Sequence, residues 1–362
     1  MATKKKVYAT HVTTPAGKRI YVKGKDKADL ERKVLEVKLA MNAGVDITCD
    51  QTFREYSEMW LRVYKKPPKV RESSYLIYQS CLNTHLIPFF GGMKLRDIKP
   101  LHVQMFLSSL SGFSRSTQSR CVQMLRAILL SAEDNGLIVR SPVRSNDRPS
   151  GENPKEEVPL TNEQARELLA AVSGTRAYTF CLLALSTGMR RGEILGLMWE
   201  DIDLDAGIIT VTHNKVFLAK GNDAPVTTHL KTDSARRVIP LSGLLLDHLR
   251  ELHASSTSPY VISMKDGASL TRASYHALWQ IVDNRSLGSR SGVLSFRCHP
   301  HQLRHTFITQ LFESGLDLKQ VQYLAGHATP DMTLRVYTHF RKQSRAQETA
   351  QQTRAAVAYL NG

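Results

Sequence analysis

The sequence predicts an α+β protein of several domains: a small N-terminal unit of β-sheet and one helix, a helical bundle, and a mainly α-helical domain with a small antiparallel sheet. The 362 residues exceed the usual size of one domain, and 42% of them are hydrophobic, which suffices for more than one core. Strand-like alternation is confined to residues 7–23 and 208–241, whereas most other segments repeat apolar residues with helical spacing.

The first segment, residues 1–46, should form the sheet-and-helix unit. Val7 to Val12 and Arg19 to Lys23 alternate as strands on either side of the turn Thr14–Gly17, and Lys27 to Met41 has helical periodicity. Basic residues outnumber acidic ones, which leaves a net charge of +6. We expect either a surface that binds a polyanion or an ordinary solvated face.

The second segment, residues 50–140, is helical throughout. Thr52 and Glu55 suit a capped helix start, and Pro67 ends that helix. Three more helices are expected at residues 73–89, 99–110 and 114–135, which completes a bundle. Candidates for phosphate contacts at the start of the last helix are Arg115, Ser116, Thr117 and Arg120.

Residues 141–159 contain four prolines among polar residues, which predicts a stiff linker and a domain boundary. The domain that follows, residues 160–340, should begin with a capped helix from Thr161 to Val172. Its strands are expected at 208–211, 226–228 and 237–241, and its later helices at 242–253, 271–286, 301–314, 318–326 and 331–340. Residues 341–362 are polar up to an apolar cluster at 355–360, and we expect a tail helix there.

Charge and composition narrow the function classes. The formal net charge of +16 indicates a negatively charged partner such as nucleic acid. No run of about 18 apolar residues occurs, and no apolar segment follows the N-terminal lysines, so neither a membrane span nor a secretory signal is expected. Five cysteines without CxxC spacing are typical of reduced thiols. A cytoplasmic location is therefore expected.

The most informative residues lie near the C-terminus: His301, Arg304, His305, His327 and Tyr337. A guanidinium matches a phosphate and keeps its charge, and histidine donates or accepts a proton near neutral pH. A tyrosine can attack phosphorus and form a covalent phosphotyrosyl enzyme. This inventory suits attack on a phosphodiester.

Two other interpretations apply to these residues. His301 and His305 lie on one helical face and could bind zinc together with Cys298 and His299. However, Arg304 would repel a divalent cation, and the hydrolytic zinc motif has a glutamate between its histidines. The second alternative is a polar helix with a structural role only.

A further candidate lies upstream, after the apolar run Phe180–Leu185. A buried helix should end at Gly188 and another begin close to Arg190, so that Arg190 projects from a helix start. Alternatively, Arg190 is a surface arginine paired with Glu193 at i+3.

Taken in order, these motifs resemble the tyrosine recombinase family, the integrases of phages and conjugative elements. The motifs are Thr-Gly-Met-Arg-x-x-Glu-Ile-Leu-x-Leu-x-Trp-x-Asp-Ile-Asp, Lys-Thr-x-x-x-x-Arg-x-Ile-Pro-Leu, His-x-Leu-Arg-His, Gly-His and Tyr-Thr-His, between Thr187 and His339. The resemblance implies a site-specific recombinase that cleaves and rejoins DNA strands through a 3′-phosphotyrosyl intermediate, for integration and excision of a phage or mobile element. It implies no metal, ATP or other cofactor.

The resemblance also implies a role for each matching residue. Arg190 and Arg304 would hold the scissile phosphate together with His327, and Tyr337 would be the nucleophile. Lys231, in a turn between two expected strands, would be the general acid for the leaving 5′-oxygen.

Of the other two histidines, His301 matches the position that handles the tyrosine proton, and His305 matches a supporting histidine. Motif register alone selects Arg190 rather than the adjacent Arg191 as the catalytic arginine. In the same way, it selects Lys231 rather than Lys215 or Lys220 as the general acid.

The expected partners follow from the same resemblance. Residues 1–46 would be an arm-type DNA-binding domain, with Lys18, Arg19 and Lys23 among its contacts, and residues 50–140 a core-binding domain. The chain would form a homo-oligomer, a tetramer on double-stranded DNA, in which neighbouring copies exchange the tail at 341–362. DNA-bending accessory proteins would be further partners, and no membrane partner is expected. The alternatives are a relaxing enzyme of the type IB topoisomerase kind and a catalytically silent DNA-binding accessory protein.

Overall fold

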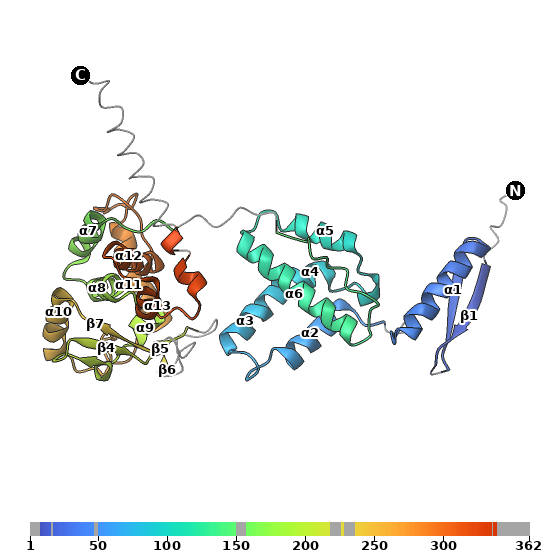
Figure 1. Ribbon diagram of the computed structural model, residues 1–362, viewed down its shortest axis with the longest axis horizontal. Coiled ribbons are helices and arrows are strands. Elements are labelled where there is room, and N and C mark those ends of the chain that lie inside the picture. Colours follow the sequence, from blue (N-terminus) through green and yellow to red (C-terminus); the bar gives the residue numbers. More distant parts are fainter. Residues whose placement is uncertain are drawn as a thin grey trace, which may run out of the picture. The chain divides into compact units, whose positions relative to one another are not determined.

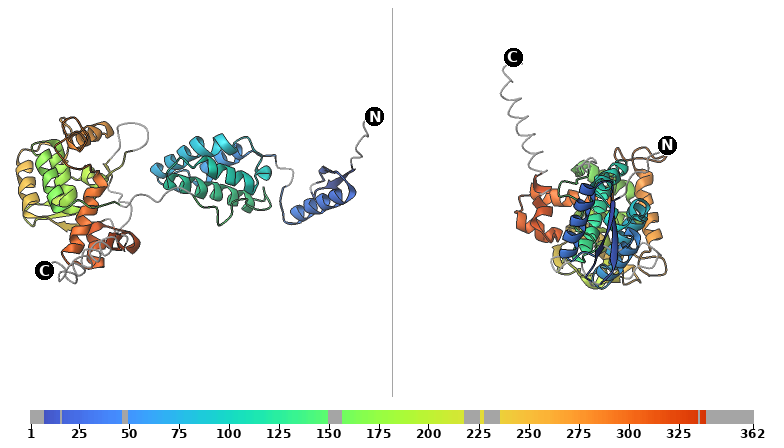
Figure 2. Two further views of the ribbon diagram at one scale, coloured as in Figure 1. Left: turned by 90° about the horizontal axis from the view of Figure 1, so that it is seen from above. Right: turned by 90° about the vertical axis from the view of Figure 1, so that its right-hand side faces the viewer.

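The computed structural model describes residues 8–15, 17–46, 50–149, 157–217, 226–227, 236–334 and 336–338. The predicted tail helix at 341–362, Lys231, Lys220 and the linker residues 150–156 lie outside these ranges. The chain forms two compact units, residues 1–155 and 156–362. Both are mainly helical with small antiparallel sheets, which confirms the predicted α+β fold class (Figures 1 and 2).

The first unit begins with a hairpin and one helix. Strands β1 (Tyr8–Thr13) and β2 (Arg19–Gly24) pair antiparallel, and α1 (Lys27–Asn42) packs against them. Asp26 caps the helix, because its carboxylate accepts a 2.7 Å hydrogen bond from the Asp29 backbone N–H. Val12 and Val22 are buried under the helix, which leaves the alternate strand positions exposed.

The bundle of the same unit contains α2 (Phe53–Tyr64), α3 (Glu72–Cys81), α4 (Ile87–Phe90), α5 (Pro100–Ser109) and α6 (Arg115–Asp134). Its core is aromatic and aliphatic, and includes Phe53, Phe90 and Phe106. The helix predicted at 73–89 is interrupted by a π-helical turn, Leu82–Leu86. Pro88 explains the interruption, since its ring lacks an N–H and would clash with the carbonyl four residues earlier in a regular helix.

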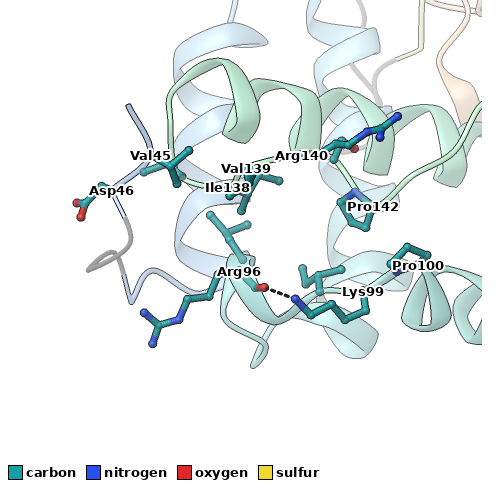
Figure 3. Close-up of a pocket in the computed structure, with 13 residues that line it drawn as sticks. Val45, Asp46, Arg96, Lys99, Pro100, Ile138, Val139, Arg140 and Pro142 are labelled. Atoms are coloured by element: carbon teal, nitrogen blue, oxygen red, sulfur yellow. Dashed lines mark hydrogen bonds between the residues drawn. The ribbon is translucent and has the colours of Figure 1, made fainter. Parts of the chain in front are cut away.

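A pocket of about 350 Å³ opens in this bundle beside the start of α5 (Figure 3). Its floor is apolar, and Arg96, Lys99 and Arg140 are the cations of its lining. Lys99 Nζ donates a 3.2 Å hydrogen bond to the Arg96 carbonyl. None of the residues predicted for the catalytic site lines this pocket.

The second unit has a buried helix at its centre. Nine of the twelve residues of α8 (Arg176–Thr187) are buried, as expected of a helix that is apolar on most faces. Helices α7 (Asn162–Val172), α11 (Arg272–Arg285) and α12 (Pro300–Glu313) contact it. The remaining helices are α9 (Arg191–Gly196), α10 (Gly243–Ala254) and α13 (Leu318–Ala325), and residues 330–334 and 336–338 are also helical.

The small sheets of this unit differ in part from expectation. β4 (Ile208–Val211) lies between β3 (Ile202–Asp203) and β7 (Arg237–Pro240). β6 (Val226–Thr227) does not join that sheet but pairs with β5 (Asn214–Lys215), a strand that the sequence pattern did not predict. Two-residue strands carry too little alternation to be predicted from sequence. No helix in the described part of the chain is long and apolar enough to cross a membrane.

Candidate active site

The first arginine of the candidate site depends on a tight contact between α8 and α12. Helix α8 ends at Gly188, whose φ of 58° is in the left-handed region that favours glycine. A Cβ atom at this position would lie 2.2 Å from the Phe307 ring of α12. Glycine therefore lets the two helices approach, and the Gly188 carbonyl accepts a hydrogen bond from Arg304 Nη1.

Arg304 is almost completely buried, with 2% of its surface exposed. Its second terminal nitrogen, Nη2, donates to the carbonyl of Ala325, the last residue of α13. Burial lowers the pKa of Arg304 to about 9, and the charge of Arg190 acts in the same direction. The guanidinium still carries its charge at neutral pH, and two carbonyls fix its orientation.

Arg190, at the start of α9, donates to the neighbouring carbonyl, that of Gly326. Its backbone N–H and its Nη1 each donate a 2.8 Å hydrogen bond to the carboxylate of Glu193, and its Nη2 donates to the Gly326 carbonyl. The predicted pair with Glu193 therefore exists. It is not a surface pair, because the Glu193 side chain is only 3% exposed and the Arg190 side chain 35%.

The cluster contains a third arginine, Arg237, which is the arginine of the motif Lys-Thr-x-x-x-x-Arg-x-Ile-Pro-Leu. Its side chain is fully buried, Nη2 donates a 2.9 Å hydrogen bond to Glu193, and Nε donates 2.7 Å to the Leu324 carbonyl. Burial disfavours the charged form of Glu193, but the charges and hydrogen bonds of Arg237 and Arg190 favour that form more strongly. The pKa of Glu193 is therefore lowered. A sequence signal existed, since strand alternation places Arg237 on the same face as buried Ile239.

His327 follows the end of α13. That helix ends at Gly326 with a φ of 61°, and a Cβ there would lie 2.8 Å from Arg237 Nη1. The His327 ring is buried, and its Nδ1 lies 2.8 Å from Thr333 Oγ1. Burial lowers the pKa of His327 to about 3, and the charges of Arg304, Arg190 and Arg237 add to this effect. His327 is therefore neutral at physiological pH and carries one ring N–H.

His301 lies on the first turn of α12, one turn before Arg304. Its pKa is lowered, because neighbouring atoms remove water from part of the ring and the charges of Arg304 and Arg190 oppose protonation, although Glu157 acts the other way. His305 lies one turn later on α12 and is half-buried. Arg304 and Arg190 donate to the carbonyls of Ala325 and Gly326, which directly precede His327. These contacts bring the two arginines to the end of α13, where His327 follows.

Tyr337 packs elsewhere on α12. Its ring centre lies 5.1 Å from that of Phe312, within a small apolar cluster formed by α12 and α13. Phe312 comes eight residues after Arg304, which is about 12 Å along a helix. The ring of Tyr337 therefore lies against the C-terminal part of α12, whereas the arginines lie near its N-terminal part.

The alternatives for the arginine and the lysine occupy different surroundings. The exposed guanidinium of Arg191 lies over the rings of Tyr275 and Phe217, away from the bonds that Arg190 makes. Lys215 is buried and donates to Ser269 Oγ. Lys231 lies outside the described residues.

The candidates for DNA contact all belong to the first unit. Lys18, Arg19 and Lys23 are exposed on the hairpin β1–β2. The other four, Arg115, Ser116, Thr117 and Arg120, occupy the first turns of α6, which Ser114 caps by accepting a hydrogen bond from the Thr117 N–H. Among the described residues, no group of three or more His, Cys, Asp or Glu side chains is placed to hold a metal ion.

Comparisons with known proteins cover both units. The family model described as phage integrase family matches residues 159–344, about half of the chain. A second model, described as phage integrase, N-terminal SAM-like domain, matches residues 52–111. The protein named tyrosine recombinase XerC-like from Caldanaerobacter subterraneus subsp. tengcongensis is 27% identical over 345 residues, which cover 87% of this chain and 86% of that protein.

Two solved structures share the fold. The Tn1549 transposon integrase in complex with transposon right end DNA superimposes with a TM-score of 0.69, at 21% identity, over 83% of this chain and 99% of the other. A lambda integrase tetramer bound to a Holliday junction gives a TM-score of 0.58, at 17% identity, over 91% and 94%. At these identities the likeness concerns the fold.

Proposed function

The chain belongs to the phage integrase family, and on that basis we propose how it works: as a site-specific recombinase, it cleaves and rejoins DNA strands through a covalent bond between Tyr337 and the 3′-phosphate at the break. The enzyme is a tyrosine-type recombinase, and its relatives carry the names of recombinases and integrases. The roles of individual residues are part of the proposal.

The observation that carries these roles is an excess of positive charge in a buried cluster. Arg190 and Arg237 form ion pairs with Glu193, and Arg304, whose charge Glu193 also stabilises, donates hydrogen bonds to two backbone carbonyls. Buried charges are normally paired, and among the described residues the three positive charges exceed the one carboxylate of this cluster, so an added anion would balance them. A phosphodiester would supply the anion, and its non-bridging oxygens gather further negative charge as the phosphorus is attacked. Donors that backbone carbonyls already orient would stabilise this charge without rearrangement.

The reaction then proceeds in two balanced steps. The Tyr337 side chain first leaves its place beside Phe312 and moves to the phosphate. Its oxygen then forms a bond to phosphorus while the bond from phosphorus to the 5′-oxygen breaks. His301, which is neutral at pH 7 because its pKa is lowered, accepts the phenol proton, and Lys231 donates a proton to the leaving 5′-oxygen. A 5′-hydroxyl reverses these steps when it attacks the phosphotyrosyl bond, so the exchange conserves the phosphodiester and consumes no ATP.

His327 would contribute a neutral hydrogen bond to the phosphate. If Thr333 donates its hydroxyl proton to Nδ1, the remaining ring proton sits on Nε2, the nitrogen that Thr333 does not occupy. Thr333 would thereby select the tautomer that donates. His305 would support the packing of α12 behind this site.

The domain roles and the partners belong to the same proposal. Residues 1–46 would bind arm sites, which are accessory DNA sites, and residues 50–140 would bind core sites. The linker at 141–159 would join these domains to the catalytic domain at 160–340. The tail at 341–362 would dock on a neighbouring copy. The relatives bound to transposon end DNA and, as a tetramer, to a Holliday junction support double-stranded DNA and a second copy of the chain as partners. DNA-bending proteins and a cytoplasmic location complete the proposal.

The test is covalent capture on a nicked suicide substrate, analysed on denaturing gels. Tyr337→Phe should bind DNA with unchanged affinity but form no covalent adduct, because it loses only the nucleophilic oxygen. Tyr323→Phe is the matched control, since Tyr323 lies in the same unit and its hydroxyl accepts a hydrogen bond from the Val238 N–H. A DNA-linked band that persists in Tyr337→Phe would refute the assignment. Relaxation of supercoiled DNA without any site dependence would instead identify a topoisomerase.

A further inference from the structure

Arg191 is held next to two aromatic rings by a close contact between α9 and β5. A Cβ on Gly192 would lie 2.3 Å from Asn214 Oδ1 and 2.7 Å from the Lys215 carbonyl oxygen. Because residue 192 is glycine, the first turn of α9 packs directly on this strand. The contact brings Arg191 beside Phe217, two residues beyond the end of β5.

The rings orient the guanidinium of Arg191. Its central carbon lies 5.3 Å from the ring centre of Tyr275 on α11 and 6.0 Å from that of Phe217, distances at which a cation is attracted to an aromatic face. Burial raises the pKa of Tyr275 to about 12, although the charge of Arg191 acts in the other direction. Tyr275 is therefore a neutral platform at physiological pH.

The surroundings of the Arg191 charge differ from those of Arg190. Across the described residues, no Asp or Glu forms an ion pair with Arg191, whereas its neighbour Arg190 is paired with Glu193. Arg272, at the start of α11, adds a second positive charge nearby, since its Nη2 donates a 3.3 Å hydrogen bond to the Phe217 carbonyl. A guanidinium in a fixed orientation, on an exposed residue that forms no ion pair within the described parts of the chain, is suited to bind a phosphate.

We propose that Arg191, supported by Tyr275 and Phe217, binds a phosphate of the DNA backbone other than the one that reacts. The inference rests on the proposed function, because it takes DNA as the ligand. The Cα atoms of Arg190 and Arg191 are about 3.8 Å apart, yet their guanidiniums have different partners and so serve different phosphates. Since phosphates recur about every 3.4 Å along the axis of each strand, a second one lies within reach of the same helix start.

The experiment compares Arg191→Gln with Arg250→Gln. Arg250 is the matched control because it lies in the same unit, donates a hydrogen bond to the Leu204 carbonyl and is near Asp247. DNA affinity is measured between about 50 and 200 mM salt, the range over which phosphate contacts weaken strongly. Arg191→Gln should lower affinity roughly three- to tenfold and reduce the slope of log K against log salt by about 0.9, the value for one phosphate contact. Arg250→Gln should change neither quantity.

The loss should concern affinity more than the chemical step. With DNA at saturation, the single-turnover cleavage rate of Arg191→Gln should fall by less than about threefold, whereas removal of a donor to the reacting phosphate is expected to lower it roughly 10²-fold. An unchanged salt slope, or a rate loss that exceeds the affinity loss, would overturn the proposal.

Neutral methylphosphonates placed one at a time near the cleavage site would locate the phosphate. At one position, which is not the scissile one, the substitution should weaken binding by the wild type but not by Arg191→Gln. Phe217→Leu should weaken DNA binding through loss of the contact to the same phosphate. Combined with Arg191→Gln, it should lower DNA affinity little further than Arg191→Gln does alone. If every position affects both proteins equally, Arg191 binds no phosphate. This result is independent of Tyr337, whose capture assay tests the proposed chemistry separately.

Discussion

Replacement of Glu193 with glutamine would remove the carboxylate that joins Arg190 to Arg237. Glu193 Oε1 accepts from Arg190 Nη1 at 2.8 Å, and Oε2 accepts from the Arg190 backbone N–H at 2.8 Å and from Arg237 Nη2 at 2.9 Å. Glutamine keeps the shape and one acceptor, but its amide group would face a guanidinium donor. The fully buried charge of Arg237 would then have lost its carboxylate.

The magnitude follows from these contacts. Two of the three hydrogen bonds join charged side chains, and such bonds contribute about 1.5–3 kcal/mol each. Removal of one partner of a buried ion pair lowers stability by about 3–5 kcal/mol, mostly because the other charge remains buried. We therefore expect Glu193→Gln to lower the free energy of unfolding by about 3–5 kcal/mol at pH 7. DNA cleavage should also fall, because Arg190 would lose its anchor.

The effect should depend on pH in a definite direction. The pKa of Glu193 is lower in the folded protein than in the unfolded chain, where a glutamate titrates near about 4.3. The stability due to its charge is therefore present above about pH 4.3 and is lost as the pH falls through the lower pKa of the folded state. The difference between wild type and Glu193→Gln should be largest at neutral pH and shrink below about pH 4.

Urea unfolding of the full chain at several pH values measures this difference, with Glu251→Gln as the control, because Glu251 is exposed on α10. Glu251→Gln should leave the unfolding free energy unchanged within error at each pH. A loss below about 1 kcal/mol in Glu193→Gln at pH 7, or a loss that does not shrink in acid, would refute the view that this carboxylate holds the arginine cluster together.

Three further predictions concern the arginines, Lys231 and the contact between α8 and α12. Arg190→Ala and Arg304→Ala should each slow single-turnover cleavage roughly 10²-fold or more, whereas Arg191→Ala should slow it much less; the opposite order would mean that Arg191 enters the site. Lys231→Ala should cleave a substrate with a bridging 5′-sulfur nearly as well as wild type, because sulfur leaves without a proton, and equal defects on the oxygen and sulfur substrates would remove Lys231 as the acid. Gly188→Ala should lower the melting temperature, since a left-handed alanine costs about 1–2 kcal/mol and its Cβ would meet the Phe307 ring at 2.2 Å, and an unchanged melting temperature would contradict this packing.

Motif order alone led to the family and to most of the proposed catalytic residues. The family match over residues 159–344 confirms the recognition, because Thr-Gly-Met-Arg, His-x-Leu-Arg-His and Gly-His are short motifs whose residue types the chemistry restricts. Element types were also predictable where a pattern is long. The buried helix that ends at Gly188 and the capped helix from Thr161 are examples, since apolar periodicity and capping are local properties.

The fold class and the family were predictable from the sequence, because they depend on local patterns and on motif order. The groups that surround the arginines were not predictable, because long-range packing selects them. The alternative interpretation of Arg190 placed its pair with Glu193 on the surface, whereas Glu193 is buried. Arg237 joins the cluster from a strand 44 residues away from Glu193. Likewise, Arg190 and Arg191 are adjacent in sequence, yet one meets the carbonyl of Gly326 and the other the ring of Tyr275. Burial and long-range contacts determine the charge, the pKa and the direction of a side chain. A local sequence pattern carries no information about either, because both depend on residues far away in the chain.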